Sequence, residues 1–160
     1  MYKRQVCWGS SGSGKSSISL NLAYELASRG WRVCLIDADT YHPSLAAWLG
    51  ITQTPGGLAA CLRLSRQNRL GSEDFERLVQ KIEFPECSFR VITGLTSPNR
   101  WAEVDSLAIQ NLAENLQSEF DLLIWDVASY CEIGLISADS GRDRNQATQH
   151  LLATADIALA

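Results

Sequence analysis

A short glycine- and serine-rich segment near the N-terminus constrains the fold of this chain more than any other feature. Residues 9–16 read GSSGSGKS and match the pattern G-x-x-x-x-G-K-[S/T] at every fixed position. The apolar stretch 5–9 precedes the segment, and the helical pattern of 15–29 follows it. Small residues between a strand and a helix let backbone N–H groups point inward, where the helix N-terminus favours an anion. The segment therefore predicts a phosphate-binding loop, whose expected contact residues are Gly9, Ser10, Ser11, Gly12, Ser13, Gly14, Lys15, Ser16 and Ser17.

Apolar runs alternate with helical patterns along the rest of the chain. Strands are expected at 5–9, 31–37, 89–94, 121–127 and 155–160, and helices at 15–29, 42–50, 54–64, 72–82, 103–120 and 143–154. This alternation predicts an α/β fold with a doubly wound, mostly parallel sheet. The last apolar run stops with the chain. We therefore expect residues 1–160 to be one P-loop NTPase domain that is truncated at its C-terminus, the N-terminal part of a longer domain.

Two details of the expected helices can be compared with a structure. In the helix at 15–29, helical spacing places Ile18, Leu22, Ala23 and Leu26 on one buried face. In the helix at 72–82, Ser72 has the residue type of an N-cap and is followed by acidic residues.

Composition narrows the function classes. The apolar fraction is 46%, the charged fraction is 20% and the net charge is −4, so no strong basic field favours nucleic acid as a partner. No apolar run approaches the roughly 18 residues that span a bilayer, and no signal-peptide core follows the first basic residues. We expect a cytoplasmic protein. Its five cysteines are widely spaced and form no C-x-x-C pair, which argues against a zinc site or a disulfide framework.

Acidic residues follow two of the expected strands. Asp126 ends the run DLLIWD, whose strand we expect beside the loop strand, and Asp37 and Asp39 end LIDAD. Carboxylates at these strand ends, with the hydroxyl of Ser16, are suited to hold Mg²⁺ or its waters, while Lys15 is placed to reach the β- and γ-phosphates. The alternative is structural: Asp126 could cap a helix or turn, and Asp37 or Asp39 could cap a turn before Pro43.

Taken together, these motifs resemble the ParA/MinD group of P-loop ATPases. The segments PGGLAACL at 55–62 and FDLLIWD at 120–126 strengthen the resemblance, and VITGLTSPNRWAEV at 91–104 and the segment 144–160 are similar to its CpaE-like, pilus- and secretion-associated branch of actinobacterial type. The resemblance implies Mg-ATP binding, a nucleotide-dependent homodimer and an ATPase that positions a secretion, pilus or division assembly through a protein partner or a membrane.

The resemblance also implies roles for individual residues. Lys15 would contact phosphate and serve catalysis, Asp39 would orient the attacking water, and Ser16, Asp37 and Asp126 would serve the metal. Residues 39–47 would form a switch segment that senses the γ-phosphate. Recruitment to a membrane or cell pole would depend on a partner, and the sequence leaves direct membrane contact open.

One departure from the family keeps alternatives open. Members usually carry a second lysine at the second loop position, where this chain has Ser10. Serine has no charge with which to reach a phosphate in a partner subunit. One alternative is therefore a nucleotide-binding scaffold without useful catalysis. Another is a protein like the bacterial tyrosine kinases of the same superfamily. Those kinases usually carry a cluster of tyrosines at the C-terminus, whereas the tyrosines of this chain are dispersed: Tyr2, Tyr24, Tyr41 and Tyr130.

Three weaker patterns have simple structural interpretations. Arg63, Arg66 and Arg69 recur every third residue and could contact DNA or an acidic partner, but a solvated helix face is favoured. Trp125 is expected in the core with Trp8. Trp48 could contact a partner or a second subunit, but partial burial is favoured.

Overall fold

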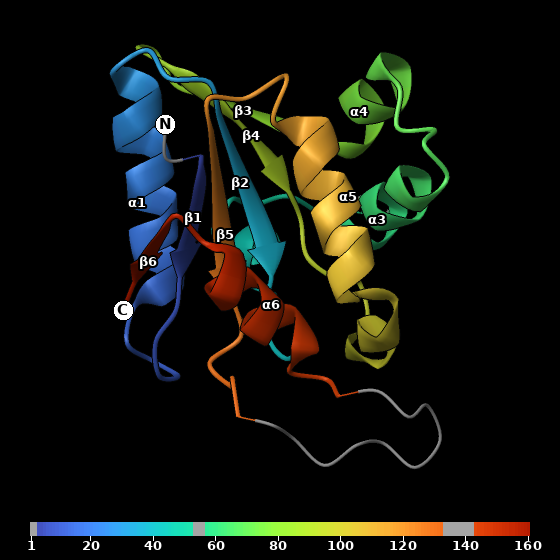
Figure 1. Cartoon of the computed structure of the whole chain (residues 1–160). Coiled ribbons are helices and arrows are strands. Elements are labelled where there is room, and N and C mark those ends of the chain that lie inside the picture. Colours follow the sequence, from blue (N-terminus) through green and yellow to red (C-terminus); the bar gives the residue numbers. More distant parts are fainter. Residues whose placement is uncertain (1–2, 53–56, 133–142) are drawn as a thin grey trace.

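A six-stranded sheet forms the centre of the molecule (Figure 1). The computed structural model describes residues 3–52, 57–132 and 143–160. Within them the strand order is β3-β4-β2-β5-β1-β6, and all neighbours are parallel except β3 and β4. The strands are β1 (Arg4–Cys7), β2 (Val33–Ala38), β3 (Gln80–Glu83), β4 (Ser88–Ile92), β5 (Leu122–Val127) and β6 (Ile157–Leu159). The predicted mostly parallel sheet is confirmed.

Helices cover both faces of this sheet, as the doubly wound prediction requires (Figure 1). Helix α1 packs on one face, and α3, α5 and α6 lie on the other. The helical segments are α1 (Lys15–Ser28), α2 (Leu45–Trp48), α3 (Gly57–Arg66), α4 (Ser72–Leu78), the 3-10 helix η1 (Pro98–Glu103), α5 (Ser106–Leu116) and α6 (Gln146–Thr154). Strands β2 and β5, at the centre of the sheet, are buried along their whole length. Trp125 on β5 is fully buried, and Trp8 packs partly buried against the same core, as predicted.

The buried face of α1 agrees with the prediction only in part. Ala23 is buried as predicted, together with Ser19 and Ala27, while Leu22 and Leu26 are half-buried and Ile18 is 53% exposed. Small side chains let a helix lie close to a sheet, and this packing outweighs the hydrophobic spacing of the larger residues. Gly30, just past the end of the helix, has φ +88°, the left-handed conformation that often ends a helix.

The segment predicted as one helix over 72–82 is divided. Helix α4 ends at Leu78, and residues 80–83 pair with β4 as the antiparallel edge strand β3. Gly71 occupies the N-cap position, so Ser72 is the first helical residue and the predicted cap is wrong. The helix expected over 103–120 is also shorter, since Asp105 caps α5 by accepting a 2.9 Å hydrogen bond from the Ala108 N–H.

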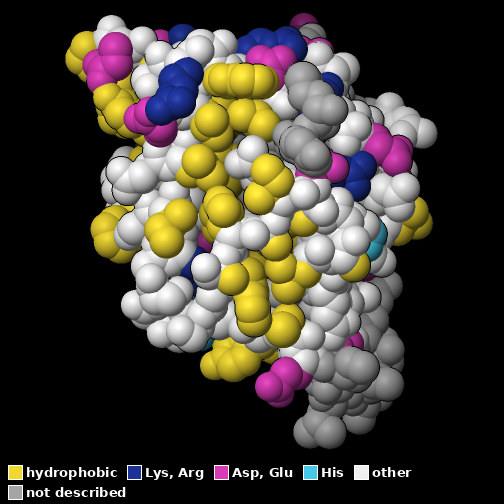
Figure 2. Space-filling view, turned by 60° about the vertical axis from the view of Figure 1, so that its left-hand side comes forward, with side chains coloured by type: hydrophobic (Ala, Val, Ile, Leu, Met, Phe, Trp, Pro, Cys, Tyr) yellow, Lys and Arg dark blue, Asp and Glu magenta, His cyan; other side chains and the backbone are white. Residues whose placement is uncertain are grey.

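Hydrophobic side chains gather on the side of the molecule that carries α1 and β6 (Figure 2). Strand β6 is an edge of the sheet, and Ile157 on it is 39% exposed. In the described part of the chain, no helix combines the length and the apolar character needed to cross a membrane.

Candidate functional site

The glycine-rich loop lies between β1 and α1, at the carboxyl edge of the sheet. Gly12 and Gly14 have φ +80° and +87°, left-handed conformations that side chains rarely adopt. A Cβ at Gly9 would lie 2.6 Å from Ser13 Oγ, and the Ser13 N–H donates to the Ser10 carbonyl at 3.1 Å. Residues 10–14 are exposed. The glycines thus serve the tight path of the loop, whose backbone stays accessible to a ligand.

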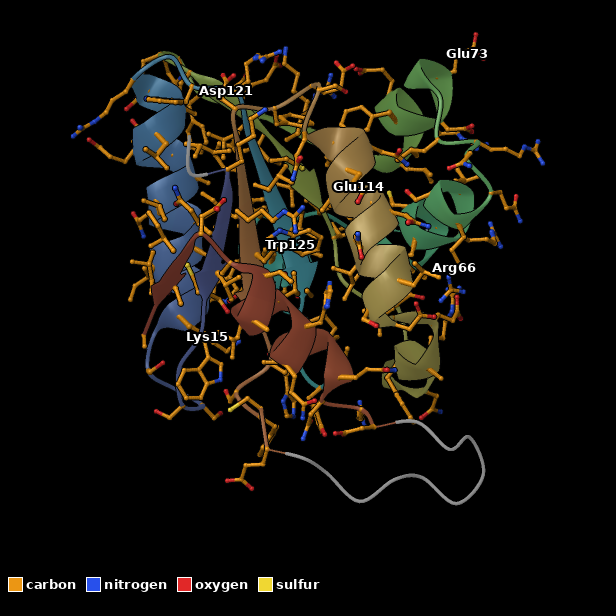
Figure 3. All side chains as sticks on the ribbon, viewed as in Figure 1. Lys15, Arg66, Glu73, Glu114, Asp121 and Trp125 are labelled. Atoms are coloured by element: carbon orange, nitrogen blue, oxygen red, sulfur yellow. The ribbon has the colours of Figure 1, made fainter. Side chains whose placement is uncertain are left out.

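Lys15, the first residue of α1, points at one aspartate that follows β2 and at another near the carboxyl end of β5. Its Nζ lies 2.9 Å from Asp39 Oδ2 and 3.7 Å from Asp126 Oδ1. Figure 3 places Lys15 near the lower, carboxyl end of the sheet. Burial opposes the charge of this ammonium, but the carboxylates of Asp126 and Asp39 outweigh it and raise the pKa of Lys15. The structure therefore brings Lys15, Asp39 and Asp126 together, as the sequence predicted.

Asp37 and Asp126 occupy equivalent positions on neighbouring parallel strands. They are register partners in the β2–β5 pair, and both are buried. Burial raises the pKa of Asp37 to about 7, and the nearby Asp126 charge adds to this effect. Burial also raises the pKa of Asp126. Two carboxyls in this position disfavour their charged forms unless a cation is near.

The two aspartates of the LIDAD motif also organise the chain that follows them. Asp37 Oδ2 accepts hydrogen bonds from the N–H groups of Ser44 and Leu45, at 2.9 and 3.0 Å. Asp39 Oδ1 accepts from the N–H groups of Tyr41 and His42, at 2.9 and 2.8 Å. Although burial alone would raise it, the His42 N–H and the Lys15 ammonium keep the pKa of Asp39 below its usual value. The turn-capping alternative is therefore realised at both residues, in addition to the contact with Lys15.

The oxygen atoms around Asp126 fit a hard divalent cation. Asp126 Oδ2 is buried and has no hydrogen-bond partner within the described residues, while Ser19 Oγ lies 3.3 Å from its Oδ1. Ser16 Oγ lies 3.3 Å from Ser44 Oγ, on the segment that Asp37 holds. Hydroxyl and carboxylate oxygens are the ligands that Mg²⁺ prefers. Within the described ranges, no group of three or more His, Cys, Asp or Glu side chains is arranged for a metal. All five cysteines are free thiols.

A group of residues beside this site was not predicted from the sequence. Tyr41 contacts Arg144, Asn145 and Tyr130, which come from the far end of the chain. No local pattern marks these residues, because the contacts join segments that lie far apart in the sequence, 104 positions in the case of Tyr41 and Asn145. Trp48, at the end of α2, is 63% exposed, so its predicted partial burial is wrong. Arg66 contacts Asp105 and the Glu103 carbonyl on an exposed helix face, in agreement with the solvated interpretation.

A cavity of about 620 Å³ lies at the opposite, amino end of the strands. Phe75, Phe89 and Phe120 contribute to its lining, and its arginines already have acidic partners: Arg32 pairs with Asp121, and Arg90 pairs with Glu76. Figure 3 shows Asp121 at the upper end of the sheet, far from Lys15. The candidate site is therefore the loop and its carboxylates, since they combine backbone donors with charged groups of opposite sign.

Comparison with known proteins agrees with this geometry. Residues 5–151 match the CobQ/CobB/MinD/ParA nucleotide binding domain. The tyrosine-protein kinase CpsD of Streptococcus agalactiae is 27% identical over 143 residues, which cover 82% of this chain and 59% of the kinase.

Solved structures have the same fold. A ParA family ATPase from Chlorobium tepidum has a TM-score of 0.72 at 19% identity, over 97% of this chain and 59% of that one. The septum site-determining protein MinD from Pyrococcus horikoshii, complexed with Mg-ADP, has a TM-score of 0.64 at 19% identity, over 98% of this chain and 56% of MinD. The chain thus spans somewhat more than half the length of each of these three proteins. With a matched domain, a doubly wound sheet and a complete phosphate-loop motif, the chain belongs to the CobQ/CobB/MinD/ParA family of P-loop nucleotide-binding domains.

Proposed function

We propose that this chain is an ATP-dependent molecular switch that hydrolyses ATP slowly. The observation that carries the proposal is the position of Lys15, whose ammonium joins the phosphate-loop helix to Asp39, the first residue of the proposed switch segment. In this proposal residues 9–17 bind the phosphates of ATP. Asp39 orients the attacking water, and Lys15 neutralises charge on the phosphates.

The geometry suggests how ligand binding would change the switch segment. A phosphate in the loop would compete with Asp39 for the Lys15 ammonium, since that ammonium pairs with Asp39 and, in this proposal, also binds the phosphates. Asp39 also holds the N–H groups of Tyr41 and His42. A change in the partner of its carboxylate would therefore alter the turn at residues 39–42. This coupling supports a device that reports nucleotide occupancy to a partner.

Magnesium is part of the proposal. Ser16, Asp37 and Asp126 are the residues proposed to hold the ion or its waters, in agreement with the buried Asp126 oxygen that has no protein partner among the described residues. The ion would supply charge neutralisation at the phosphates. The Mg-ADP of the similar MinD structure supports this choice of cofactor.

The proposed cellular role rests on sequence motifs. In this proposal the protein is a nucleotide-dependent homodimer in the cytoplasm. It acts on a secretion, pilus or division assembly, as in the CpaE-like branch, whose motifs the segments 91–104 and 144–160 resemble. Ser10 in the place of a second loop lysine favours slow turnover, because no loop charge extends toward a partner's phosphate. The alternative, a scaffold that binds nucleotide without hydrolysing it, is also based on Ser10.

A second candidate function is protein-tyrosine phosphorylation. The similarity to CpsD favours it, since that protein is a tyrosine kinase and 82% of this chain aligns with it. Among the tyrosines in the described ranges, half-exposed Tyr130 is the most accessible to a second molecule.

The test is Mg-ATP turnover and binding in Lys15→Ala, with Lys81→Ala as the matched control. Lys81 is exposed on the edge strand β3 and pairs only with Glu83 among the described residues. We expect Lys15→Ala to abolish binding and turnover and Lys81→Ala to change neither. Binding without turnover in the wild type would favour the scaffold, and phosphotyrosine after incubation with Mg-ATP would favour the kinase. Full activity of Lys15→Ala would overturn the proposed site.

A further inference from the structure

Tyr41 links Asp39 to two residues at the start of α6. Its backbone N–H donates to Asp39 Oδ1 at 2.9 Å, and its hydroxyl donates to Asn145 Oδ1 at 2.8 Å. The guanidinium of Arg144 lies 4.0 Å from the Tyr41 ring centre, a distance at which a cation is attracted to an aromatic face. The backbone and the side chain of one residue thus contact the candidate catalytic carboxylate and a separate helix.

The partners of Tyr41 are themselves held in place. Asn145 is 7% exposed, and its Nδ2 donates to the Glu132 carbonyl at 2.8 Å, so both ends of its amide are used. Arg144 Nη2 donates to the Thr40 carbonyl at 2.6 Å, on the residue between Asp39 and Tyr41. The Tyr130 ring, on the segment that follows β5, lies 4.8 Å from the Tyr41 ring. Contacts from both later segments therefore converge on residues 40 and 41.

We infer that Tyr41, Arg144 and Asn145 form a clamp that fixes the turn at residues 39–42 and so positions the Asp39 carboxylate against Lys15. We call these three residues the Tyr41 clamp. It rests on the proposed function, in which Asp39 orients the attacking water. Arg144 and Asn145 are then positioning residues: they act through Thr40 and Tyr41 and need no contact with the nucleotide.

The clamp accounts for one feature that the loop and its carboxylates leave unexplained. Tyr41 carries a large aromatic ring next to a turn that needs only its backbone N–H. Arg144 contacts both this ring and the neighbouring Thr40 carbonyl. Fixing two successive residues by hydrogen bonds and stacking restrains the backbone more than either contact alone, because both must break before the turn can move.

The experiment compares Tyr41→Phe, Arg144→Ala and Arg144→Lys with two matched controls, Tyr24→Phe and Arg77→Ala. Tyr24 on α1 contacts Glu86, and Arg77 on α4 pairs with Asp74, both outside the candidate site. Tyr41→Phe removes only the hydroxyl bond to Asn145, and Arg144→Lys keeps a cation that can reach the Thr40 carbonyl. Three quantities are measured: the Kd of a fluorescent ATP analogue, the kcat and KM of hydrolysis, and hydrogen exchange at the amides of Tyr41 and His42.

For Tyr41→Phe and Arg144→Ala we expect kcat to fall about tenfold or more, because small displacements of a positioning group are costly. The Kd should change less than about twofold, since the phosphate loop is untouched, and exchange at the two amides should rise about tenfold. Arg144→Lys should restore part of the kcat and part of the protection from exchange, and the two controls should match the wild type.

Two results would overturn the clamp. One is unchanged exchange at the two amides in Tyr41→Phe and Arg144→Ala, whether or not kcat falls. The other is raised exchange with unchanged kcat, which would show that the contacts restrain the turn without positioning Asp39 for hydrolysis. If the wild type hydrolyses no ATP, the proposed hydrolysis fails instead, and the exchange measurement alone decides whether the clamp exists.

Discussion

The Lys15 ammonium lies 2.9 Å from Asp39 Oδ2, and their side chains are only 12% and 6% exposed. This ion pair connects two segments that follow different strands, β1 and β2. Since water screens it little, the attraction between the two charges is stronger than in a surface ion pair, although their desolvation offsets part of it, and losing one partner leaves a buried charge. The resting protein therefore keeps its phosphate-binding lysine on a carboxylate of the switch segment.

A double-mutant cycle on Lys15→Met and Asp39→Asn should give a coupling of about 1–3 kcal/mol in the free energy of unfolding, as expected for a partly desolvated pair. Urea unfolding of the nucleotide-free protein measures it. The control cycle uses Glu25 and Arg29, an exposed i,i+4 pair on α1, for which the coupling should be about 0.5 kcal/mol or less. Equal couplings in the two cycles would show that the buried pair has no special strength.

Asp37→Asn should remove a pH dependence of stability. The folded pKa of Asp37 is about 7 and its ordinary value is 3.8, so the folded state binds the proton more tightly than the unfolded state. The free energy of unfolding contributed by this group therefore falls as the pH rises from about 4 to about 7, by at most about 1.4 kcal/mol per pH unit. Unfolding curves in magnesium-free buffer across this window measure the effect.

The Asn side chain can still accept the N–H groups of Ser44 and Leu45, so Asp37→Asn should gain stability relative to the wild type as the pH rises. The control is Glu73→Gln, which removes the same charge from the exposed first turn of α4 (Figure 3). A constant stability difference between Asp37→Asn and the wild type over this window would contradict the raised pKa.

Gly94→Ala should destabilise the fold and disturb the site together. A Cβ at Gly94 would lie 2.4 Å from Pro43 Cβ and 2.9 Å from Asp37 Cγ, so the switch segment must shift to admit it. We expect a loss of about 1–3 kcal/mol and a weaker affinity for nucleotide. Gly71→Ala is the control, since a Cβ there meets nothing within 4 Å and should cost less than about 1 kcal/mol. Thermal unfolding and nucleotide titration of both variants test this, and wild-type behaviour of Gly94→Ala would refute it.

Asp126→Asn should uncouple nucleotide binding from magnesium. If the buried Asp126 oxygen serves the ion, Mg²⁺ should raise the affinity of the wild type for ADP. The increase should be smaller in the variant, by a factor of about ten or more. Without Mg²⁺ the variant should bind ADP at least as well, because a negative charge near the phosphates is gone. Calorimetry with Mg²⁺ or EDTA measures both quantities. Asp121→Asn, at the other end of the same strand, is the control, and an equal magnesium effect in both variants would exclude this role.

The sequence predicted the features that depend on local patterns. The phosphate loop, the parallel central strands and the convergence of Asp37, Asp39 and Asp126 follow from residue type and strand order, because parallel strands bring their carboxyl ends to one edge. The register of β2 and β5 then places Asp37 opposite Asp126. What the sequence left open was whether these aspartates cap turns or serve a ligand, and Asp37 and Asp39 do cap turns.

Two of the errors share one cause, contacts outside the helix that a helical pattern does not reveal. Residues 80–83 continue a helical pattern but pair with β4, and Ile18 has helical spacing but lies outside the close contact of α1 with the sheet. The Tyr41 clamp was invisible for the same reason. Its residues carry no motif, and only the folded sheet brings α6 beside the segment that follows β2.

The pairing of β1 with β5 has a consequence for the synthesis of this protein. Ser19 and Asp126, which lie 3.3 Å apart in the folded chain, are separated by 107 positions in the sequence. During translation, the glycine-rich loop leaves the ribosome long before the strand that places a carboxylate beside its lysine. At about 5–20 residues per second, several seconds or more pass in between. A nascent chain can therefore carry the complete loop motif before the strand with Asp126 has been made. Contacts that involve Asp126 and a bound nucleotide or its metal cannot contribute to the early steps of folding.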